Sequence, residues 1–228
     1  MEQMVIALDV DGTLFDGVAV APVATEAIRQ AHADGHTIII VTGRRWESLQ
    51  SVIPAIVGMC DRVVCEEGGV LVNVASGELA LLAEPVEPAL IDALFAAGVP
   101  DLDIGHVVVG APASWRAEVQ SARDAVGSQR HLVLNKGSVA LAPLGCDKGT
   151  GLRAALASLG LQQRRVIAIG DAANDLPMFA IAAIAVGVAN ADEAVRSAGI
   201  TLTSGAVGLG VAEALHAHLP RSTSAGRA

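Results

Sequence analysis

Apolar runs alternate with helical patterns along the first third of the chain. Residues 5–8 are a continuous apolar run, and residues 37–41 are apolar after Thr37; such segments are typical of strands buried on both faces of a sheet. Between them, residues 22–34 place apolar side chains at the i, i+3, i+4 and i+7 spacing of one helix face. A second helix is predicted over 45–53 and a third strand over 62–65. Strands that alternate with helices in this way predict a parallel sheet with right-handed crossovers.

The same alternation returns near the end of the chain. Leucine and alanine recur on one helical face over residues 148–159, and the apolar run 166–169 predicts another buried strand. A short helix over 175–180, a strand over 183–186 and a helix over 208–218 complete this half. The two halves together predict an α/β protein with a Rossmann-like, doubly wound parallel sheet.

The middle of the chain follows a different pattern. The mainly apolar segments 70–74 and 79–82 flank a turn-like stretch that contains Ser76-Gly77, which predicts a hairpin. Further on, the sequence predicts helices over 88–97 and 113–126 and strands over 107–109, 132–134 and 139–141, the last two joined by a tight turn at 135–137. Residues 84–143 are therefore expected to form a small α+β cap domain, inserted into a core domain made of residues 1–83 and 144–228.

Composition and charge narrow the classes of protein to consider. Acidic residues outnumber basic ones by 24 to 15, and only 2% of the residues are aromatic. Nucleic-acid binding needs a basic surface and often stacking aromatics, so we expect no nucleic-acid partner. Although 52% of the residues are apolar, the longest nearly uncharged apolar stretch, residues 178–189, falls short of the roughly 20 residues of a membrane span. We therefore expect no membrane association.

The remaining whole-chain features predict a protein of the cytoplasm without a disulfide framework. The first residues, Met-Glu-Gln-Met, lack the basic region of a signal peptide, so a cytoplasmic location is expected. The three cysteines do not have metal-site spacing and predict no disulfide framework. For the assembly we expect a monomer or a homodimer.

The clearest chemical signal is the segment Asp9-Val10-Asp11-Gly12-Thr13, which directly follows the first predicted strand. Side chains two positions apart on an extended segment point the same way, so both carboxylates can project from the carboxyl end of the strand. Open α/β sheets bind their ligands at that edge. Two like charges held together call for a cation or a shared proton, and Gly12 lets the backbone approach an anion closely.

Two shorter motifs add polar groups where an anion could bind. Thr42 and Gly43 follow the second strand, and a hydroxyl beside a glycine amide suits an anionic oxygen; helix capping by Thr42 explains that residue equally well. Lys148 begins the predicted helix 148–159, where a cation opposes the helix dipole unless an anion is bound nearby. A solvated lysine, offset by Asp147, is the alternative for that position.

A second acidic motif follows the strand over 166–169. The segment Gly170-Asp171-Ala172-Ala173-Asn174-Asp175 brings two more carboxylates to the same edge of the sheet. Carboxylate and amide oxygens are hard ligands that suit Mg²⁺, which usually keeps several waters and takes one or two carboxylates. We therefore expect Asp171 and Asp175 to share a magnesium site with the first acid pair.

In the order acid pair, hydroxyl, lysine, acid pair, the four motifs resemble those of the haloacid dehalogenase-like hydrolase superfamily. The chain resembles in particular the Cof-like branch, in which an α+β cap is inserted between the second and third motifs, here residues 84–143. Segments 140–149, 170–179 and 187–191 resemble that branch as well. The short cap is similar to that of the small-cap members, which include archaeal-type phosphoglycolate phosphatases and sugar-phosphate phosphatases.

The resemblance implies a phosphoric monoester hydrolase that cleaves a small-molecule phosphate ester through an aspartyl-phosphate. Asp9 would be the nucleophile, and Asp11 would be the general acid and base. The resemblance further implies that Mg²⁺ is bound by Asp9, the main-chain carbonyl of Asp11 and Asp171, with Asp175 either as a further ligand or as a residue that supports the ligands. The groups that would contact the phosphate oxygens are Gly12, Thr42, Gly43, Lys148 and Asn174.

The sequence departs from the branch after the third strand, where it has Glu66-Glu67-Gly68-Gly69 in place of the usual Glu-Asn-Gly-Ala. A charged Glu67 therefore replaces a neutral amide near the expected pocket. The cap is expected to choose the substrate, and the candidates for contact with the substrate are Arg44, Arg45, Arg116 and Lys136.

The residues leave two other functions open. A phosphomutase of the same superfamily shares Asp9 and Asp11 but would release little phosphate. A non-catalytic protein that binds a phosphorylated metabolite could use the same pocket, although the intact acid pair favours catalysis. Dehalogenases attack carbon and do not need the second acid, so Asp11 favours phosphate chemistry.

Overall fold

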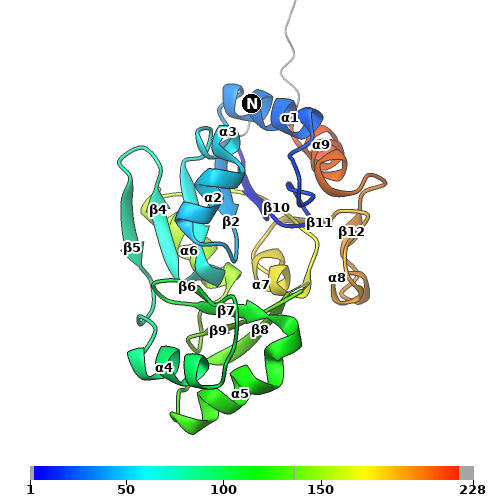
Figure 1. Ribbon diagram of the computed structural model, residues 1–228. Helices are drawn as coiled ribbons and strands as arrows, with labels where there is room; N and C mark the ends of the chain where they lie inside the picture. Colours follow the sequence, from blue (N-terminus) through cyan, green and yellow to red (C-terminus); the bar gives the residue numbers. More distant parts are fainter. Residues whose placement is uncertain (1–2, 136, 221–228) are drawn as a thin grey trace, which may run out of the picture.

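The apolar runs of the two chain halves pair into one eight-stranded sheet, in the order β12-β11-β10-β1-β2-β3-β4-β5 (Figure 1). The structure is a computed structural model that describes residues 3–135 and 137–220. The strands are β1 (Val5–Leu8), β2 (Thr37–Val41), β3 (Arg62–Cys65), β4 (Val70–Asn73), β5 (Glu78–Leu81), β10 (Val166–Gly170), β11 (Ile184–Gly187) and β12 (Thr201–Leu202). Six of them are parallel, and the predicted hairpin β4–β5 extends the sheet with two antiparallel strands.

The strand order reverses at β1, which lies between β2 and β10. Val5 pairs in parallel with Thr37 on one side and with Val166 on the other, and the register continues to the carboxyl ends of the strands. Such a reversal leaves a crevice outside the carboxyl ends of the two central strands, where open α/β sheets bind ligands. The residues that follow β1 and β10 therefore meet at the same edge of the sheet.

Helices cover both faces of this sheet, which confirms the doubly wound α/β fold. Ile6 and Leu8 of β1 point to one face and Val5 and Ala7 to the other, so this central strand is apolar throughout. The first face is covered by α1 (Pro22–Ala33), α2 (Trp46–Val52), α3 (Pro54–Val57) and α9 (Val207–His218), and the second by α6 (Lys148–Ser158), α7 (Leu176–Phe179) and α8 (Glu193–Ser197). Within residues 3–135 and 137–220, no helix combines the length and apolar character that crossing a membrane requires.

A second, antiparallel sheet of four strands lies beside the carboxyl edge of the first, drawn in green in Figure 1. Its order is β6 (Asp103–Ile104), β7 (Val109–Pro112), β9 (Ser138–Ala142) and β8 (His131–Asn135). The helices α4 (Pro88–Ala96) and α5 (Arg116–Ala125) pack together on it, and Leu90, Leu94 and Val119 form the centre of a separate apolar cluster. This smaller unit closes over the crevice of the large sheet.

Several elements differ from the sequence-based predictions. The strand expected at 107–109 begins only at Val109, because the main-chain N–H groups of Val107 and Val108 donate to the carboxylate of Glu66. The helix expected over 113–126 opens with a 3₁₀ turn and becomes α-helical at Arg116. The elements β6, β12, α3 and α8 were not predicted, because they are too short to show a periodicity.

Candidate active site

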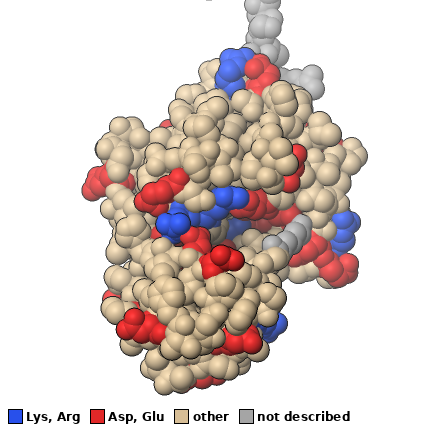
Figure 2. All heavy atoms as spheres, in the orientation of Figure 1, with Lys and Arg blue, Asp and Glu red and all other residues tan. Residues whose placement is uncertain are grey.

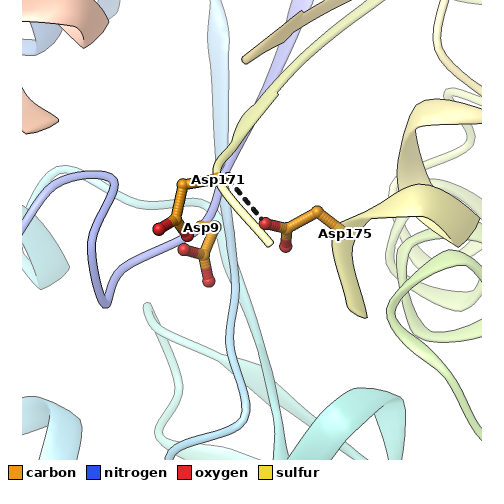
Figure 3. A group of neighbouring side chains, drawn as sticks. All are labelled: Asp9, Asp171 and Asp175. Atoms are coloured by element: carbon orange, nitrogen blue, oxygen red, sulfur yellow. Dashed lines mark hydrogen bonds between the residues drawn. The ribbon is translucent and has the colours of Figure 1, made fainter. Parts of the chain in front are cut away.

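Four acidic residues follow the strands at the point where the strand order reverses. Asp9 and Asp11 come after β1, Asp171 comes after β10, and Asp175 ends the 3₁₀ turn Ala173–Asp175. Carboxylate oxygens of Asp9, Asp171 and Asp175 lie within 4.8 Å of one another, and all three side chains are buried (Figure 3). The structure therefore gathers three of the four acids into one cluster that could hold a metal ion.

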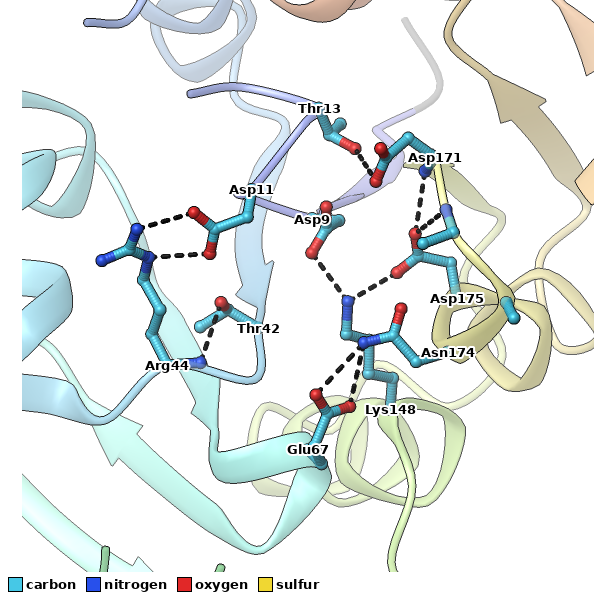
Figure 4. Close-up of polar contacts among 12 residues, drawn as sticks. Asp9, Asp11, Thr13, Thr42, Arg44, Glu67, Lys148, Asp171, Asn174 and Asp175 are labelled. Carbon is cyan, nitrogen blue, oxygen red and sulfur yellow. Dashed lines mark hydrogen bonds and ion pairs between the residues drawn. The ribbon is translucent and has the colours of Figure 1, made fainter. Parts of the chain in front are cut away.

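Lys148 supplies the cation of this cluster. It is the first residue of α6, and Asp147 caps that helix by accepting a hydrogen bond from the N–H of Thr150 at 2.7 Å. The Nζ of Lys148 donates to Oδ1 of Asp9 at 2.7 Å and to Oδ1 of Asp175 at 2.6 Å (Figure 4). Because its side chain is only 1% exposed, the alternative of a solvated lysine is wrong.

The electrostatics of the cluster favour a bound cation. Burial, followed by the charge of Asp175, raises the pKa of Asp9 from 3.8 to about 8 in spite of the nearby ammonium. Burial disfavours the charged form of Lys148, but the carboxylates of Asp175 and Asp9 outweigh it and raise the pKa of Lys148. Lys148 contacts Asp9 and Asp175, so the three buried carboxylates outnumber the one ammonium beside them, and a hard divalent cation would compensate the remaining negative charge.

Main-chain groups and a hydroxyl fix the two acids of the second motif. The N–H groups of Asp171 and Ala172 donate to Oδ2 of Asp175 at 2.8 and 3.0 Å, and Oγ1 of Thr13 donates to Oδ1 of Asp171 at 3.3 Å. Gly12 has φ +82°, and a Cβ on it would lie 2.3 Å from Oδ2 of Asp171. Only glycine therefore allows the loop after β1 to pass so close to Asp171.

Thr13 and Asn190 support the site, although the sequence suggested no role for either residue. Asn190 donates through Nδ2 to the main-chain carbonyl of Gly12 at 2.8 Å and accepts through Oδ1 from the N–H of Val207 at 2.8 Å. It thereby ties the loop after β1 to the start of α9. In the sequence, only the resemblance of segment 187–191 to the Cof-like branch singles out Asn190, and its spacing does not indicate a contact with Gly12.

Asp11 points away from the three clustered carboxylates, and Arg44 binds both of its oxygens (Figure 4). The metal-binding role expected of Asp11 is therefore limited to its main-chain carbonyl, because its side chain is not part of the cluster. The structure places the carboxylate of Asp11 on the wall of the same cavity as Asp9.

Thr42 and Gly43 lie in the loop after β2, close to Asp11. The N–H of Thr42 continues the sheet by donating to the carbonyl of Val64 at 2.9 Å, and its Oγ1 accepts from the N–H of Arg44 at 3.2 Å. Arg45, not Thr42, is the N-cap of α2, so the alternative of helix capping by Thr42 is wrong. Gly43 lines the cavity beside the acids.

Asn174 is buried in the site, but its amide nitrogen already has a partner. Its Nδ2 donates to both carboxylate oxygens of Glu67, each at 3.1 Å (Figure 4). The resemblance implies that Asn174 contacts the phosphate oxygens. In this arrangement, however, its Nδ2 is taken by Glu67 and is not free to donate to a phosphate. Glu67, at which this chain differs from the usual sequence of the Cof-like branch, is therefore in direct contact with a residue expected to bind the phosphate.

A cavity of about 350 Å³ lies between the carboxyl edge of the large sheet and the second sheet. The large sheet contributes Asp9, Asp11, Gly43, Arg44, Arg45 and Glu67 to its wall, and β7 and β9 contribute the opposite wall. Figure 2 shows a hollow at this level, where basic and acidic side chains gather. Two of the four candidates for substrate contact, Arg44 and Arg45, thus face the cavity.

The other two candidates are not placed there. Arg116 is exposed at the start of α5 and does not line the cavity, because the face of α5 that packs on the second sheet carries Val119 and Ala122 instead. Lys136 lies outside the described residues. Arg45 forms an ion pair with Asp103 of β6, and this pair joins the two sheets across the cavity mouth.

Comparison with known proteins agrees with this geometry. A family model described as haloacid dehalogenase-like hydrolase matches residues 6–98 and 114–215. The chain is 28% identical over 226 residues to a phosphoglycolate phosphatase of Nitrosopumilus maritimus, with 94% of this chain and 96% of that protein covered. It is 32% identical over 220 residues to a phosphoglycolate phosphatase of Methanothermobacter thermautotrophicus, with coverage of 92% and 96%.

Solved structures share the fold at lower identity. A haloacid dehalogenase-like hydrolase from Bacteroides thetaiotaomicron superimposes with a TM-score of 0.80 at 20% identity, covering 96% of this chain and 100% of that chain. A sugar phosphatase of HAD subclass IIB superimposes with a TM-score of 0.72 at 18% identity, covering 94% and 98%. Both the large sheet and the inserted smaller unit are therefore present in proteins of this architecture.

Proposed function

Because the chain belongs to the haloacid dehalogenase-like hydrolase family, we propose that it is a magnesium-dependent phosphoric monoester hydrolase of small-molecule substrates. The observation that carries the proposal is the meeting of Asp9, Asp171 and Asp175 with Lys148 in one buried cluster at the carboxyl ends of β1 and β10. The reaction supported by this cluster is transfer of a phosphoryl group to a carboxylate and then to water.

Asp9 is the nucleophile of the proposed reaction. Attack of its carboxylate oxygen on phosphorus forms the aspartyl-phosphate and breaks the bond to the leaving alcohol oxygen. Asp11 gives a proton to that oxygen and later takes a proton from the water that attacks the aspartyl-phosphate. This second step releases inorganic phosphate and restores Asp9. Arg44 binds both oxygens of Asp11 and so fixes the direction of this carboxylate for the proton transfers.

Asp9, Asp171 and Asp175, with the main-chain carbonyl of Asp11, are the groups that would hold Mg²⁺. When bound, Mg²⁺ supplies positive charge that lets a carboxylate approach a phosphate dianion. The residues fit this ion, because their donors are hard oxygens and the cluster carries more carboxylates than cations. The phosphate oxygens would be contacted by the hydroxyl of Thr42, the amides of Gly12 and Gly43, and Lys148.

Phosphoglycolate is the first candidate substrate, because several of the relatives are named phosphoglycolate phosphatase. Sugar phosphates are the second, since a structural neighbour is a sugar phosphatase. Arg44 and Arg45 line the cavity where the organic part of the ester would lie. A panel of phosphoglycolate, sugar phosphates and nucleotides with Mg²⁺ tests this choice, which fails if phosphoglycolate is not among the better substrates.

Hydrolysis of p-nitrophenyl phosphate tests the proposed reaction itself. The purified protein with Mg²⁺ should release phosphate over many turnovers, and Asp9→Asn should abolish that release. Asp92→Asn, at an exposed position of α4, is the matched control and should retain it. Turnover in Asp9→Asn would overturn the proposal, and a long-lived phospho-enzyme with little phosphate release would favour a phosphomutase.

A further inference from the structure

The loop after β3 has a backbone conformation that is unusual for its residues. Glu66 and Glu67 have φ angles of 52° and 54°, and Gly68 has a φ of 102°, so three consecutive residues are left-handed. This conformation is unfavourable for glutamate, and such outliers gather at functional sites. The N–H groups of Glu66 and Glu67 donate to carbonyls of the loop after β2. The turn therefore directs one glutamate toward that loop, beside the proposed phosphate site.

The side chain of Glu67 is buried within the site, with 5% of its surface exposed. Its Oε1 lies so close to Gly43 that a Cβ on that glycine would be 2.2 Å away. Both of its oxygens accept hydrogen bonds from Asn174 (Figure 4). Burial raises the pKa of Glu67, and the charge of Lys148 opposes that shift. The carboxylate thus lies against two groups that the sequence assigned to phosphate binding.

This contact also fixes the orientation of Asn174. An ionised carboxylate can only accept hydrogen bonds, so it holds the NH₂ group of Asn174 toward itself. Among the described residues, the buried Oδ1 of Asn174 has no hydrogen-bond partner. A phosphate oxygen needs a donor rather than this acceptor. Asn174 can therefore bind a phosphate through Nδ2 only if Glu67 gives up that hydrogen bond.

We propose that Glu67 is an internal competitor of the phosphate group, which takes the donor of Asn174 and lowers the affinity of the site for inorganic phosphate. The inference rests on the proposed function, because it treats Gly43 and Asn174 as part of the phosphate site. A phosphate dianion bound there would meet the like charge of Glu67 where little water screens the repulsion.

The consequence concerns the product more than the substrate. The organic part of an ester gains further contacts with the cavity, and these contacts offset the repulsion from Glu67. Free phosphate has no such part and is left with the full repulsion. Glu67 would thus speed the release of phosphate and make the enzyme resistant to inhibition by its own product.

The experiment compares the binding of inorganic phosphate by the wild-type chain, Glu67→Gln and Asp101→Asn in the presence of Mg²⁺. Glu67→Gln removes the charge but keeps the length of the side chain and an acceptor for Asn174. Asp101 is an exposed residue on the wall of the same cavity, and Asn tolerates its left-handed backbone, so Asp101→Asn is a matched loss of charge. Calorimetry gives the Kd, and inhibition of p-nitrophenyl phosphate hydrolysis gives the Ki.

We expect Glu67→Gln to bind inorganic phosphate about tenfold more tightly than the wild type, with a matching fall in Ki. Asp101→Asn should stay within about twofold of the wild type, because its charge is screened by solvent. An unchanged or weaker affinity in Glu67→Gln, or an equal gain in both variants, would overturn the proposal. Glu67→Asn is the second variant if Glu67→Gln does not fold, since Asn adopts left-handed backbone readily, and the same gain is expected.

The two measurements separate this proposal from the proposed function. If the wild type hydrolyses no phosphate ester while Glu67→Gln still binds phosphate more tightly, the function is wrong and the role of Glu67 stands. If the wild type hydrolyses the ester and both proteins bind phosphate equally, the function stands and the role of Glu67 is wrong.

Discussion

Arg44 binds Asp11 through two parallel hydrogen bonds, from Nε to Oδ2 at 2.7 Å and from Nη2 to Oδ1 at 2.6 Å. The guanidinium is itself fixed, because Nη1 donates to Oγ of Ser48 at 3.1 Å and its central carbon lies 5.5 Å from the centroid of the Phe15 ring. A planar two-point contact of this kind fixes the direction in which a carboxylate points. Asp11 is thereby held apart from the carboxylates that contact Lys148.

Arg44→Lys should lower kcat about tenfold, because lysine keeps the charge beside the cavity but loses the two-point contact that orients Asp11. The measurement is steady-state hydrolysis of p-nitrophenyl phosphate. Arg29→Lys is the control, since Arg29 pairs with Glu26 on the exposed face of α1, and it should behave as the wild type. An unchanged kcat in Arg44→Lys would mean that the bidentate pair does not position Asp11 for the reaction.

Mg²⁺ should raise the melting temperature of the wild type, and the rise should be smaller in Asp171→Asn, which removes one buried carboxylate. A ligand that binds only the folded state stabilises it by about 2.7 kcal/mol at a concentration of one hundred times its Kd. Thermal unfolding at increasing Mg²⁺ measures the shift, and EDTA should reverse both the shift and the hydrolysis. An equal shift in the two proteins would place the cation elsewhere.

The metal-free protein should lose stability as the pH rises from about 4 to about 8. In the folded state the pKa of Asp9 is raised from 3.8 to about 8, so between these values the folded chain keeps a proton that the unfolded chain has lost. Raising the pH therefore favours unfolding. Urea unfolding in EDTA gives the slope, and subtracting the profile of Asp9→Asn isolates this residue. A difference that grows in favour of the wild type with rising pH would contradict the assignment.

Lys148→Met should destabilise the metal-free protein by about 3–5 kcal/mol, because two buried carboxylates lose their shared ammonium. The double variant Lys148→Met/Asp9→Asn should recover part of that loss, since one of the unpaired charges is gone. Free energies of unfolding from urea titrations at constant pH supply the cycle. Strictly additive losses would show that Lys148 and Asp9 do not interact.

The position of the site was predictable from the sequence, because parallel strands bring their carboxyl ends to one edge of a sheet. The apolar runs located β1 and β10, and the acids that follow them meet there although most of the chain separates Asp9 from Asp171. Lys148 was predictable for a related reason. Its place at the start of α6 follows from the helical pattern over residues 148–159, and the structure adds the cap at Asp147.

The partners of individual side chains were not predictable in the same way. The contact of Glu67 with Asn174 depends on a left-handed turn made by two glutamates, and sequence patterns associate that conformation with glycine or asparagine. Arg116 shows a second kind of failure. Periodicity located its helix, but which residues of that helix face the cavity depends on how α5 packs on the second sheet.

The neighbours β1 and β10 are joined in the chain only through the second sheet and much of the first. During synthesis, Asp9 therefore leaves the ribosome well before Lys148 and Asp171. Until then the emerging chain has the first acid pair but lacks the carboxylates of the second motif that complete the cluster. The carboxylate cluster is completed only when β10 has paired with β1. If the cluster holds Mg²⁺ as proposed, a chain that ends before β10 would lack this affinity, and the onset of metal binding would report that the two halves of the sheet have joined.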